Sequence, residues 1–478
     1  MTALVLFRND LRLHDNPALA YALSRGKKIL ALYIYEDHFD YGDEDSFQKL
    51  GAATKLWLND SLCRLSEDLA ALGSRLLICK GKQLEVISKI LSILNLGGLA
   101  DISVYWNRRY EPHHISLDTD LKDSLLKQGI EVKSFNSSLL IEPWELLNKQ
   151  SKPYQVYTPF SKQYFSLLES SMLDRTFPVI YKLSPESFYA NAEIKLLFNA
   201  NPRDLLTDLN LRVEHPWAEK MSKYVKAGES SAQESLENFI LSNIVLQYKE
   251  KRDFPSIRGT SQLSTHLHFG EISPRQIYSE VNKLNSVLKY DYLKQIIWRE
   301  FAHYLMYHFP YTVNQPLKKE FIRFKWRELD EENTLLLKKW QRGETGYPIV
   351  DAGMKELWET GWMHNRVRMI SASFLVKDLR IHWIEGAKWF WDTLFDADLA
   401  NNTMGWQWVA GTGADAAPYF RIFNPITQSE RFDAEAKYIR YWIPALNTLS
   451  NKQIHLPKNP VVDHDVERKK ALEEFKSL

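Results

Sequence analysis

The sequence predicts an α/β domain followed by an all-helical domain. Residues 3–135 alternate short apolar runs with amphipathic stretches, which is the pattern of a doubly wound parallel sheet. From about residue 205 onward, apolar residues recur three and four positions apart, and no strand pattern interrupts them. The 478 residues are 45% hydrophobic, which is enough for more than one core. We therefore expect domains at 1–135 and 204–478, joined by a connector at 136–203.

Five apolar runs are the expected strands of the first domain. The run 29–35 is apolar without alternation, as in a strand buried on both faces of a parallel sheet. Amphipathic stretches separate the runs, and one of them, 55–72, ends at Gly73, where a left-handed residue often closes a helix. No Gly-x-Gly-x-x-Gly follows the first run, so we expect no dinucleotide at the first turn of the sheet. The expected strands span 3–7, 29–35, 75–79, 102–106 and 131–135.

The stretch 136–203 loses the regular pattern because prolines interrupt it repeatedly. A structureless linker of this length is rare in a compact protein, so we expect part of it to wrap around and pack on both domains. Beyond it, Ser273-Pro274 is typical of a capped helix start. The stretches 289–305 and 350–357 carry apolar residues at helical spacing.

Charge and cysteine content narrow the class of protein. The 61 basic and 60 acidic residues give a net charge of +1, so any DNA-binding surface has to be a local patch. Two cysteines, Cys63 and Cys79, make neither a disulfide framework nor a four-ligand zinc site, which suits a reducing cytoplasm and predicts no metal. Charged residues interrupt the apolar start at Arg8, and no run of about 20 apolar residues follows. We expect a cytoplasmic protein with no membrane segment.

Residues 396–408 place three polar side chains directly before two indoles. Asp396, Asp398 and Asn402 can hydrogen-bond a polar ring system, and Trp406 and Trp408 follow them. On its own, such a stretch is most often a capped helix followed by core aromatics. Its neighbours in the sequence decide between the two interpretations.

Two further strings accompany this stretch, Gly361-Trp-Met-His-Asn-Arg-Val-Arg-Met369 and Pro418-Tyr-Phe-Arg-Ile-Phe-Asn-Pro-Ile-Thr-Gln428. Together the three resemble the flavin and substrate site of the DNA photolyase and cryptochrome family, most of all the bacterial class I enzymes that split cyclobutane pyrimidine dimers. The resemblance runs over most of the chain, from Phe7-Arg-Asn-Asp-Leu-Arg-Leu-His-Asp-Asn16 to Ile443-Pro444. It implies FAD in the helical domain, UV-damaged DNA as the partner, and a monomer without an obligate protein partner. The implied reaction is light-driven, with an electron passing from excited reduced FAD to a dimer flipped out of the DNA.

The resemblance assigns one set of residues to FAD. The string 259–264 is a cluster of small hydroxyl residues, which can hold a diphosphate but by itself is usually a cap or a turn. A pair between Arg368 and Asp396 is implied, although such a pair is also an ordinary salt bridge. Asn402 would face flavin N5, where an amide hydrogen-bonds without supplying a proton, as in photolyases rather than plant-type receptors. The full set is Tyr248, Thr260, Ser261, Gln262, Leu263, Ser264, Arg299, Arg368, Asp396, Ala397, Asp398 and Asn402.

Three tryptophans, Trp406, Trp383 and Trp326, match the family's row of indoles that carries an electron from the surface to the flavin. Indole is among the most easily oxidised side chains, so a row of indoles conducts where leucine would insulate. The alternative is three ordinary core tryptophans. The resemblance adds Asn402 and Gln295 to this catalytic set.

A second set is implied for the DNA. Trp298 and Trp408 would form an aromatic wedge for a flipped dimer, because a lesion inside the stack cannot reach a flavin inside a protein. The basic residues between Lys318 and Arg327 would add a local rim, although such a run is usually a solvated face. The remaining members are Arg252, Gln295, Asn365, Arg366, Met369 and Gln428.

Gln295 departs from the dimer-splitting pattern, which has Glu at this position. The enzymes that repair (6-4) photoproducts carry Gln there, but they need histidines where Asn365 and Met369 stand. A cryptochrome photoreceptor is a further alternative. The 34 residues after Pro444 argue against it, because they would be short for a signalling extension. A flavoprotein without light chemistry is the third.

A second, light-harvesting chromophore is expected from the resemblance. In folate-using relatives the pocket lies between the domains and uses an Asn-Glu pair. His113 and His114 stand at the matching positions here, and Glu111 is retained. Methenyltetrahydrofolate is the expected chromophore.

Overall fold

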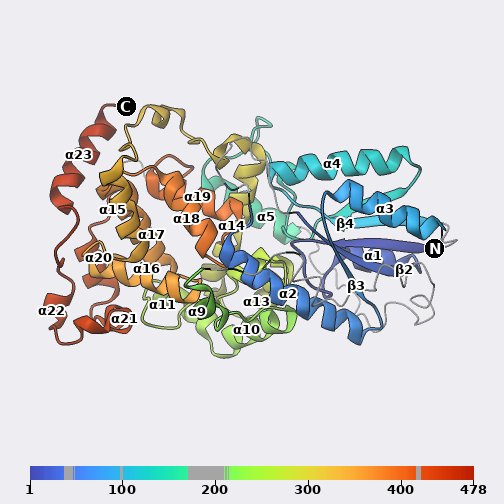
Figure 1. Cartoon of the computed structure of the whole chain (residues 1–478), viewed down its shortest axis with the longest axis horizontal. Helices are drawn as coiled ribbons and strands as arrows, with labels where there is room; N and C mark the ends of the chain where they lie inside the picture. The colour runs from blue at the N-terminus through green and yellow to red at the C-terminus, as the bar shows by residue number, and fades with distance from the viewer. Residues whose placement is uncertain are drawn as a thin grey trace.

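A parallel sheet forms one end of the molecule and a set of helices forms the other (Figure 1). The computed structural model describes residues 1–36, 47, 49–96, 101–170, 209, 211, 213, 215–415 and 421–478. Part of the expected connector, 171–203, the expected start of the helical domain at residue 204, and residues 418–420 of the site motif lie outside the described residues.

The sheet is five-stranded and wholly parallel, in the order β3-β2-β1-β4-β5. Val5 of β1 lies opposite Ala31 of β2 on one side and Tyr105 of β4 on the other. β1 is buried along its whole length, as expected of a central parallel strand. The predicted fold class is confirmed, and each strand lies within about a residue of its predicted run. The strands are β1 (Thr2–Phe7), β2 (Lys28–Tyr35), β3 (Leu76–Lys80), β4 (Ile102–Asn107) and β5 (Glu131–Phe135).

Helices cover both faces of the sheet. Apolar residues of α1 (Pro17–Ser24) and α2 (Ala52–Ala71) share one core with it. Those of α3 (Gln83–Leu96) and α4 (Pro112–Lys127), along the upper side in Figure 1, share a second. The chain adds strands to one side of β1 and then returns to add β4 on the other. In such sheets the crevice at the carboxyl ends of the two strands where the order reverses is the usual ligand site.

The sequence pattern predicted no helix within the connector, but residues 157–170 form one. A helix, α5 (Tyr157–Ser170), packs on the long helix α14. Pro159 had argued against a helix, but it is the third residue of α5, where the backbone N–H has no partner within the helix. The segment before α5 packs on both domains: Arg12 donates to the carbonyl of Ser137 at 3.0 Å, and Leu140 N donates to Glu300 at 2.9 Å.

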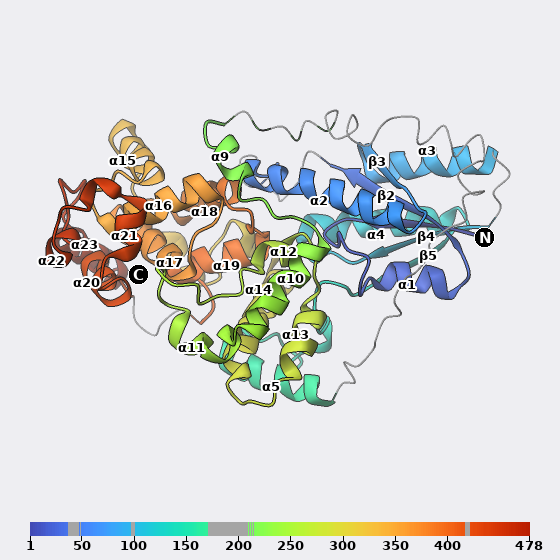
Figure 2. The ribbon, with the colours of Figure 1, turned by 90° about the horizontal axis from the view of Figure 1, so that it is seen from below.

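The rest of the described chain is helical, as predicted. Ser273 caps α13 through the backbone N–H of Gln276. α14 packs against α5, α13 and α19 and lies between the sheet and the C-terminal helices (Figure 2). No helix within the described ranges is both long and apolar enough to cross a membrane. The α-helices are α9 (Ala218–Ser222), α10 (Glu229–Leu241), α11 (Tyr248–Lys251), α12 (Ser264–His268), α13 (Pro274–Asn282), α14 (Lys289–His308), α15 (Glu331–Arg342), α16 (Pro348–Thr360), α17 (Asn365–Ser373), α18 (Trp383–Thr393), α19 (Leu399–Ala410), α20 (Pro425–Phe432), α21 (Lys437–Trp442), α22 (Asn451–Ile454) and α23 (His464–Lys476).

A buried carboxylate, Glu271, fastens the sheet end to the helical end. It accepts hydrogen bonds from Trp57 Nε1 at 3.2 Å and Ser61 Oγ at 2.5 Å, both on α2, and from Gly228 N at 2.7 Å. The neighbouring Gly270 has a φ of 64°, and a Cβ there would lie 2.1 Å from the carbonyl oxygen of Asn9. Only glycine lets the carboxyl end of β1 approach the helices this closely.

Candidate functional site

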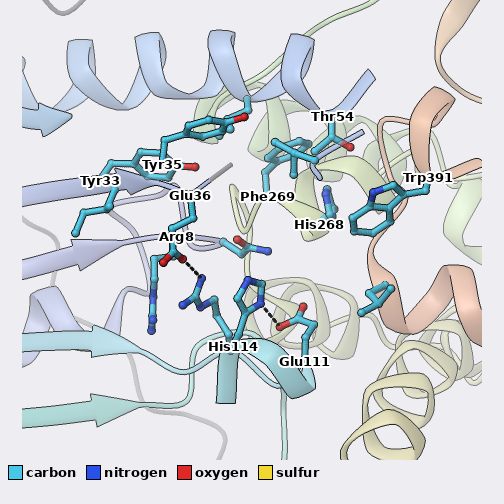
Figure 3. Close-up of a pocket in the computed structure, with 16 residues that line it drawn as sticks. Arg8, Tyr33, Tyr35, Glu36, Thr54, Glu111, His114, His268, Phe269 and Trp391 are labelled. Carbon is cyan, nitrogen blue, oxygen red and sulfur yellow. Dashed lines mark hydrogen bonds and ion pairs between the residues drawn. The ribbon is translucent and has the colours of Figure 1, made fainter. Parts of the chain in front are cut away.

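A hollow lies at the carboxyl ends of β1, β2 and β4, where the strand order reverses (Figure 3). Its walls are mostly aromatic and charged. Trp391 of α18 and Phe269 close it from the helical side. The labelled lining residues in Figure 3 are Arg8, Tyr33, Tyr35, Glu36, Thr54, Glu111, His114, His268, Phe269 and Trp391.

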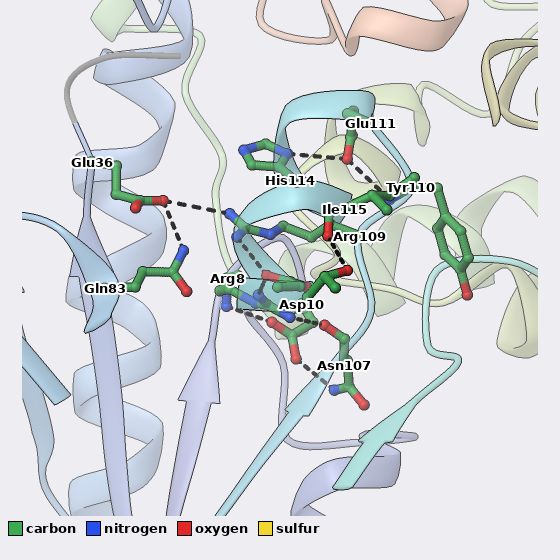
Figure 4. Close-up of polar contacts among 12 residues, drawn as sticks. Arg8, Asp10, Glu36, Gln83, Asn107, Arg109, Tyr110, Glu111, His114 and Ile115 are labelled. Carbon is green, nitrogen blue, oxygen red and sulfur yellow. Dashed lines mark hydrogen bonds and ion pairs between the residues drawn. The ribbon is translucent and has the colours of Figure 1, made fainter. Parts of the chain in front are cut away.

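Ion pairs hold the charged wall of this hollow in place (Figure 4). Arg109, whose side chain is 8% exposed, lies 3.0 Å from Asp118 of α4 and 3.9 Å from Glu36 at the end of β2. Gln83 donates to Glu36 at 2.7 Å. Burial opposes ionisation of Asp118, but the charges of Arg8 and Arg109 outweigh it and keep its pKa below the usual range. The wall therefore presents fixed charges rather than adaptable ones.

Two of the three residues expected to hold a second chromophore line this hollow. Glu111 Oε2 lies 3.2 Å from His114 Nδ1, and both side chains face the hollow in Figure 3. Burial, helped by the charge of Arg109, lowers the pKa of His114, so its ring is neutral at physiological pH. His113, the third, is not among the residues that line it.

A second, more polar hollow adjoins the first and contains Arg299 and Asp398, two of the predicted FAD residues. His303 Nε2 lies 3.8 Å from Asp398 Oδ1, and Asp398 also caps α19 through the N–H of Asn401. His268 Nδ1 is buried without a hydrogen-bond partner. A buried orphan nitrogen among charged side chains is a position where a polar ligand group fits.

The predicted pair of Arg368 and Asp396 is formed. Both guanidinium ends donate to the carboxylate, at 3.0 and 2.9 Å, and Arg368 Nε donates to the carbonyl of Met363 at 2.7 Å. Burial would raise the pKa of Asp396, but Arg368 and the hydroxyl of Ser264 outweigh it and lower the pKa. The site thus contains a rigid carboxylate that can only accept hydrogen bonds.

The hydroxyl cluster 259–264 forms a tight turn before α12. A Cβ on Gly259 would lie 2.5 Å from the carbonyl oxygen of Lys251, and Gln262 has a φ of 56°. Tyr292 of α14 donates to Ser261 Oγ at 3.0 Å, and its ring meets that of Tyr248 edge to face at 5.2 Å. The turn is therefore held against the predicted Tyr248, with Thr260 and Ser261 partly exposed.

The three tryptophans of the predicted row differ in their exposure. Trp383 and Trp406 are 1% and 2% exposed, whereas Trp326 is partly exposed. Gly386, one turn after Trp383 on α18, makes room for Trp406, because a Cβ there would lie 2.1 Å from Trp406 Cη2. The Nε1 of Trp406 is buried without a partner. Next to this row, Asn402 donates from its amide to the carbonyl of Ala387 at 3.0 Å, which orients the side chain.

Three segments predicted to contact DNA lie next to one another. Arg366 of α17 lies 2.8 Å from Asp253, and Arg252 lies 3.7 Å from the same carboxylate. The Arg366 guanidinium lies over the ring of Phe432 at 4.3 Å, one turn after Gln428 on α20. Arg366 Nε and Gln428 Oε1 are buried without partners.

The proposed aromatic wedge has a support that the sequence did not predict. The ring of Tyr157 in α5 stacks on Trp298 with centroids 3.5 Å apart and planes at 5°. Gln295 lies one turn earlier on the same helix and donates weakly to the carbonyl of Asp291 at 3.4 Å. Trp408 is partly exposed on α19.

The other predicted substrate residues make few contacts with one another. Asn365 is exposed, and its amide lies 3.9 Å from the sulfur of Met369. The expected basic rim is only partly available: Arg327 pairs with Glu467 of α23 at 2.7 Å, and Arg323 donates to the carbonyl of Leu478 at 2.9 Å. For Lys318, Lys319 and Lys325 the role stays a prediction.

Comparisons with known proteins agree over the whole chain. Residues 3–178 match the family described as DNA photolyase, and residues 292–477 match the FAD binding domain of DNA photolyase. The deoxyribodipyrimidine photo-lyase of Agrobacterium fabrum is 40% identical over 99% of this chain and 98% of its own. The chain belongs to the DNA photolyase and cryptochrome family.

Other relatives come from both branches of the family. Cryptochrome-2 of Arabidopsis thaliana is 35% identical over 95% of this chain and 72% of its own. The crystal structure of a bacterial class III photolyase from Agrobacterium tumefaciens superimposes with a TM-score of 0.86 at 39% identity, covering 100% of this chain and 97% of that one. The likeness to class I enzymes in particular therefore stays a prediction.

As a member of this family the chain carries the photolyase FAD-binding domain, and its residues fit that cofactor. The polar hollow offers both hydrogen-bond donors and acceptors, because the orphan nitrogen of His268, Arg299 and Asp398 line it. The individual roles of the predicted FAD residues stay predictions.

Sequence reasoning missed Tyr157, Asp253 and the residues that close the hollow from the helical side. Tyr157 lies in a segment that had been interpreted only as a domain crossing, and its partner Trp298 is in another helix. Asp253 directly follows Arg252, so an acidic residue inside a predicted phosphate contact was the one available signal.

Proposed function

We propose that this protein binds UV-damaged DNA and uses light to repair cyclobutane pyrimidine dimers. Family membership supports a photolyase with FAD, and the choice of lesion is our inference. The observation that supports DNA binding is that Arg252 and Arg366 both lie at Asp253, and that Arg366 also lies over Phe432 of α20. Guanidinium groups match phosphates in geometry, and the buried Nε of Arg366 has no hydrogen-bond partner.

Bound FAD supplies the light absorption and the electron for this reaction. Asp396, held ionised by Arg368, accepts hydrogen bonds from N–H groups and fixes the orientation of whatever ring it meets. Asn402, fixed by Ala387, hydrogen-bonds without a titratable proton. The chain thus orients the cofactor and gives it no acid from this position.

The aromatic side chains act on the substrate. A pyrimidine dimer has to leave the duplex, at a cost of a few kcal/mol, to enter a protein site. Stacking on an indole is worth about 1–3 kcal/mol per base, so Trp298 and Trp408 offset that cost. Tyr157 already covers one face of Trp298, which leaves the rest of the indole for the lesion.

The same proposal includes a second chromophore in the hollow at the end of the sheet. Tyr33, Tyr35 and Trp391 offer ring faces and edges, while Arg109 and Glu111 offer charges of both signs (Figure 3). Such a lining suits a planar heteroaromatic group with polar edges, such as a folate. An absorption spectrum of the purified protein, before and after the cofactors are released, tests this part.

Illumination of the reduced, FAD-loaded protein with a dimer-containing oligonucleotide tests the function. We expect the absorbance of intact thymine to return in light and not in the dark, and Arg366→Ala to weaken binding of damaged and undamaged DNA alike. No return of thymine absorbance in light, with DNA bound, would contradict the proposal. Light-dependent binding of a protein partner without repair would favour a cryptochrome, for which the likeness to Arabidopsis Cryptochrome-2 is the supporting observation.

A further inference from the structure

A histidine lies between the outer and middle tryptophans of the row. The ring centroid of His382 is 5.1 Å from that of Trp326, edge to face at 72°, and 5.7 Å from that of Trp383. Trp383 follows His382 in the chain, whereas Trp326 belongs to a separate loop. The imidazole is therefore in contact with both indoles.

The orientation of this ring is fixed. His382 caps α18, because its Nδ1 accepts the backbone N–H of Ile384 at 3.2 Å. A neutral ring whose Nδ1 accepts carries its hydrogen on Nε2. Burial, helped by the charge of Lys388, lowers the pKa of His382 to about 4, so the ring is neutral at physiological pH. The imidazole itself therefore adds no positive charge beside either neighbouring indole.

The two loops that carry Trp326 and His382 are fastened to each other. Arg327 N donates to the carbonyl of Arg380 at 2.9 Å, and Glu467 of α23 bridges the two side chains at 2.7 and 3.2 Å. Arg380 has a φ of 52°, in the left-handed region that non-glycine residues avoid, and a π-helical turn at Phe374–Asp378 precedes it. A left-handed non-glycine residue and a π-helical turn are both unfavourable on their own. They persist where the surrounding packing requires them, and they are frequent near functional sites.

We propose that His382 is a positioning residue of the tryptophan row, holding the indole of Trp326 where it can pass an electron to Trp383. The inference rests on the proposed function, to which we add that the row carries electrons from the surface to the flavin, as the family resemblance implies. In this step one electron leaves Trp326 and fills the vacancy on oxidised Trp383, so Trp326 becomes a radical cation and Trp383 returns to its neutral state. The oxidant at the inner end is the flavin in its oxidised, light-excited state and not in the reduced state that serves repair, and a dissolved thiol is the reductant that refills Trp326. His382 itself exchanges no proton, because Nδ1 holds the Ile384 N–H and Nε2 carries a hydrogen.

Two substitutions separate the ring from the cap. His382→Asn removes the ring but keeps a good capping side chain, whereas His382→Phe keeps a ring and removes the cap. In the FAD-loaded protein, transient absorption after a light flash measures how fast oxidised Trp326 forms. We expect His382→Asn to keep the melting temperature and slow this step severalfold. His382→Phe should lower the melting temperature and keep nearly the wild-type rate. Ser450→Ala is the control: it removes the side-chain cap of α22, so it should also lower the melting temperature and leave the rate unchanged.

A second readout needs no flavin. In protein labelled with 5-fluorotryptophan, the ¹⁹F resonance of Trp326 is assigned by its loss in Trp326→Phe. We expect His382→Asn to shift and broaden it, because the neighbouring ring that fixes the indole is gone. An unchanged rate and an unchanged resonance in His382→Asn would overturn the inference. If the wild type forms no oxidised tryptophan in light, conduction by the row is contradicted, while dimer repair by the reduced protein tests the proposed function separately. The ¹⁹F spectrum still decides whether His382 positions Trp326.

Discussion

Tyr157 supports the substrate side of the site through its stack on Trp298. Its ring is 9% exposed, lies 3.5 Å from the indole, and is fixed by a hydrogen bond from its hydroxyl to the carbonyl of Lys294 at 2.9 Å. Replacement of a buried aromatic by alanine costs about 3–5 kcal/mol of folding free energy. The stacked pair accounts for about 0.5–1.5 kcal/mol of this. We expect Tyr157→Ala to free Trp298 and to weaken dark binding of a dimer-containing duplex by about 1 kcal/mol, or about fivefold in Kd.

Fluorescence anisotropy with labelled damaged and undamaged duplexes measures this loss. Tyr157→Phe is the matched control: it keeps the ring and loses only the hydroxyl, so folding weakens by about 0.5–1.5 kcal/mol while DNA affinity stays at the wild-type value. Trp298→Ala gives the upper limit of the effect. A folded Tyr157→Ala protein that binds the lesion as tightly as the wild type, while Trp298→Ala does not, would refute the reasoning.

Three other changes test separate parts of the structure. Gly386→Ala places a Cβ against Trp406, so thermal unfolding should show a loss of about 1–3 kcal/mol and light-driven flavin reduction should slow; a wild-type melting curve would contradict this packing. Burial raises the pKa of Glu300 to about 7, so the folded state binds more protons than the unfolded one between about pH 4.5 and 7, and stability falls as the pH rises through that window. In urea unfolding, the wild type should lose more stability than Glu300→Gln across this window; the difference isolates Glu300, because Glu356, whose pKa is also raised to about 7, titrates there too. Asp253→Asn frees Arg252 and Arg366 for phosphates, so affinity for any duplex should rise with a steeper dependence on salt, and an unchanged salt slope would count against the phosphate role.

The fold was predictable because a strand that is buried on both faces of a parallel sheet appears in the sequence as a continuous apolar run. The run 29–35 could only be a central strand, and β2 spans Lys28–Tyr35. The helix at 157–170 was missed because proline argues against helices in general and not against their first turn. Its apolar residues, including Phe160 and Tyr164, had the right spacing.

The site was predictable where one short string contains its residues, and not where distant segments meet. Arg368 and Asp396 come from motif strings, and the structure pairs them. Tyr157 and His382 contact their tryptophans across separate segments, so neither contact follows from spacing in the sequence. Contacts between distant segments depend on the three-dimensional fold, so they can be found only once the fold is known.

The choice of lesion is tested most directly by competition in a single tube. The reduced, FAD-loaded protein is illuminated with two duplexes, one carrying a cyclobutane pyrimidine dimer and one a (6-4) photoproduct, and the released bases are resolved by chromatography after digestion. We predict that thymines are restored from the cyclobutane duplex alone. Restoration from the (6-4) duplex, or from neither duplex although both are bound, would contradict the account.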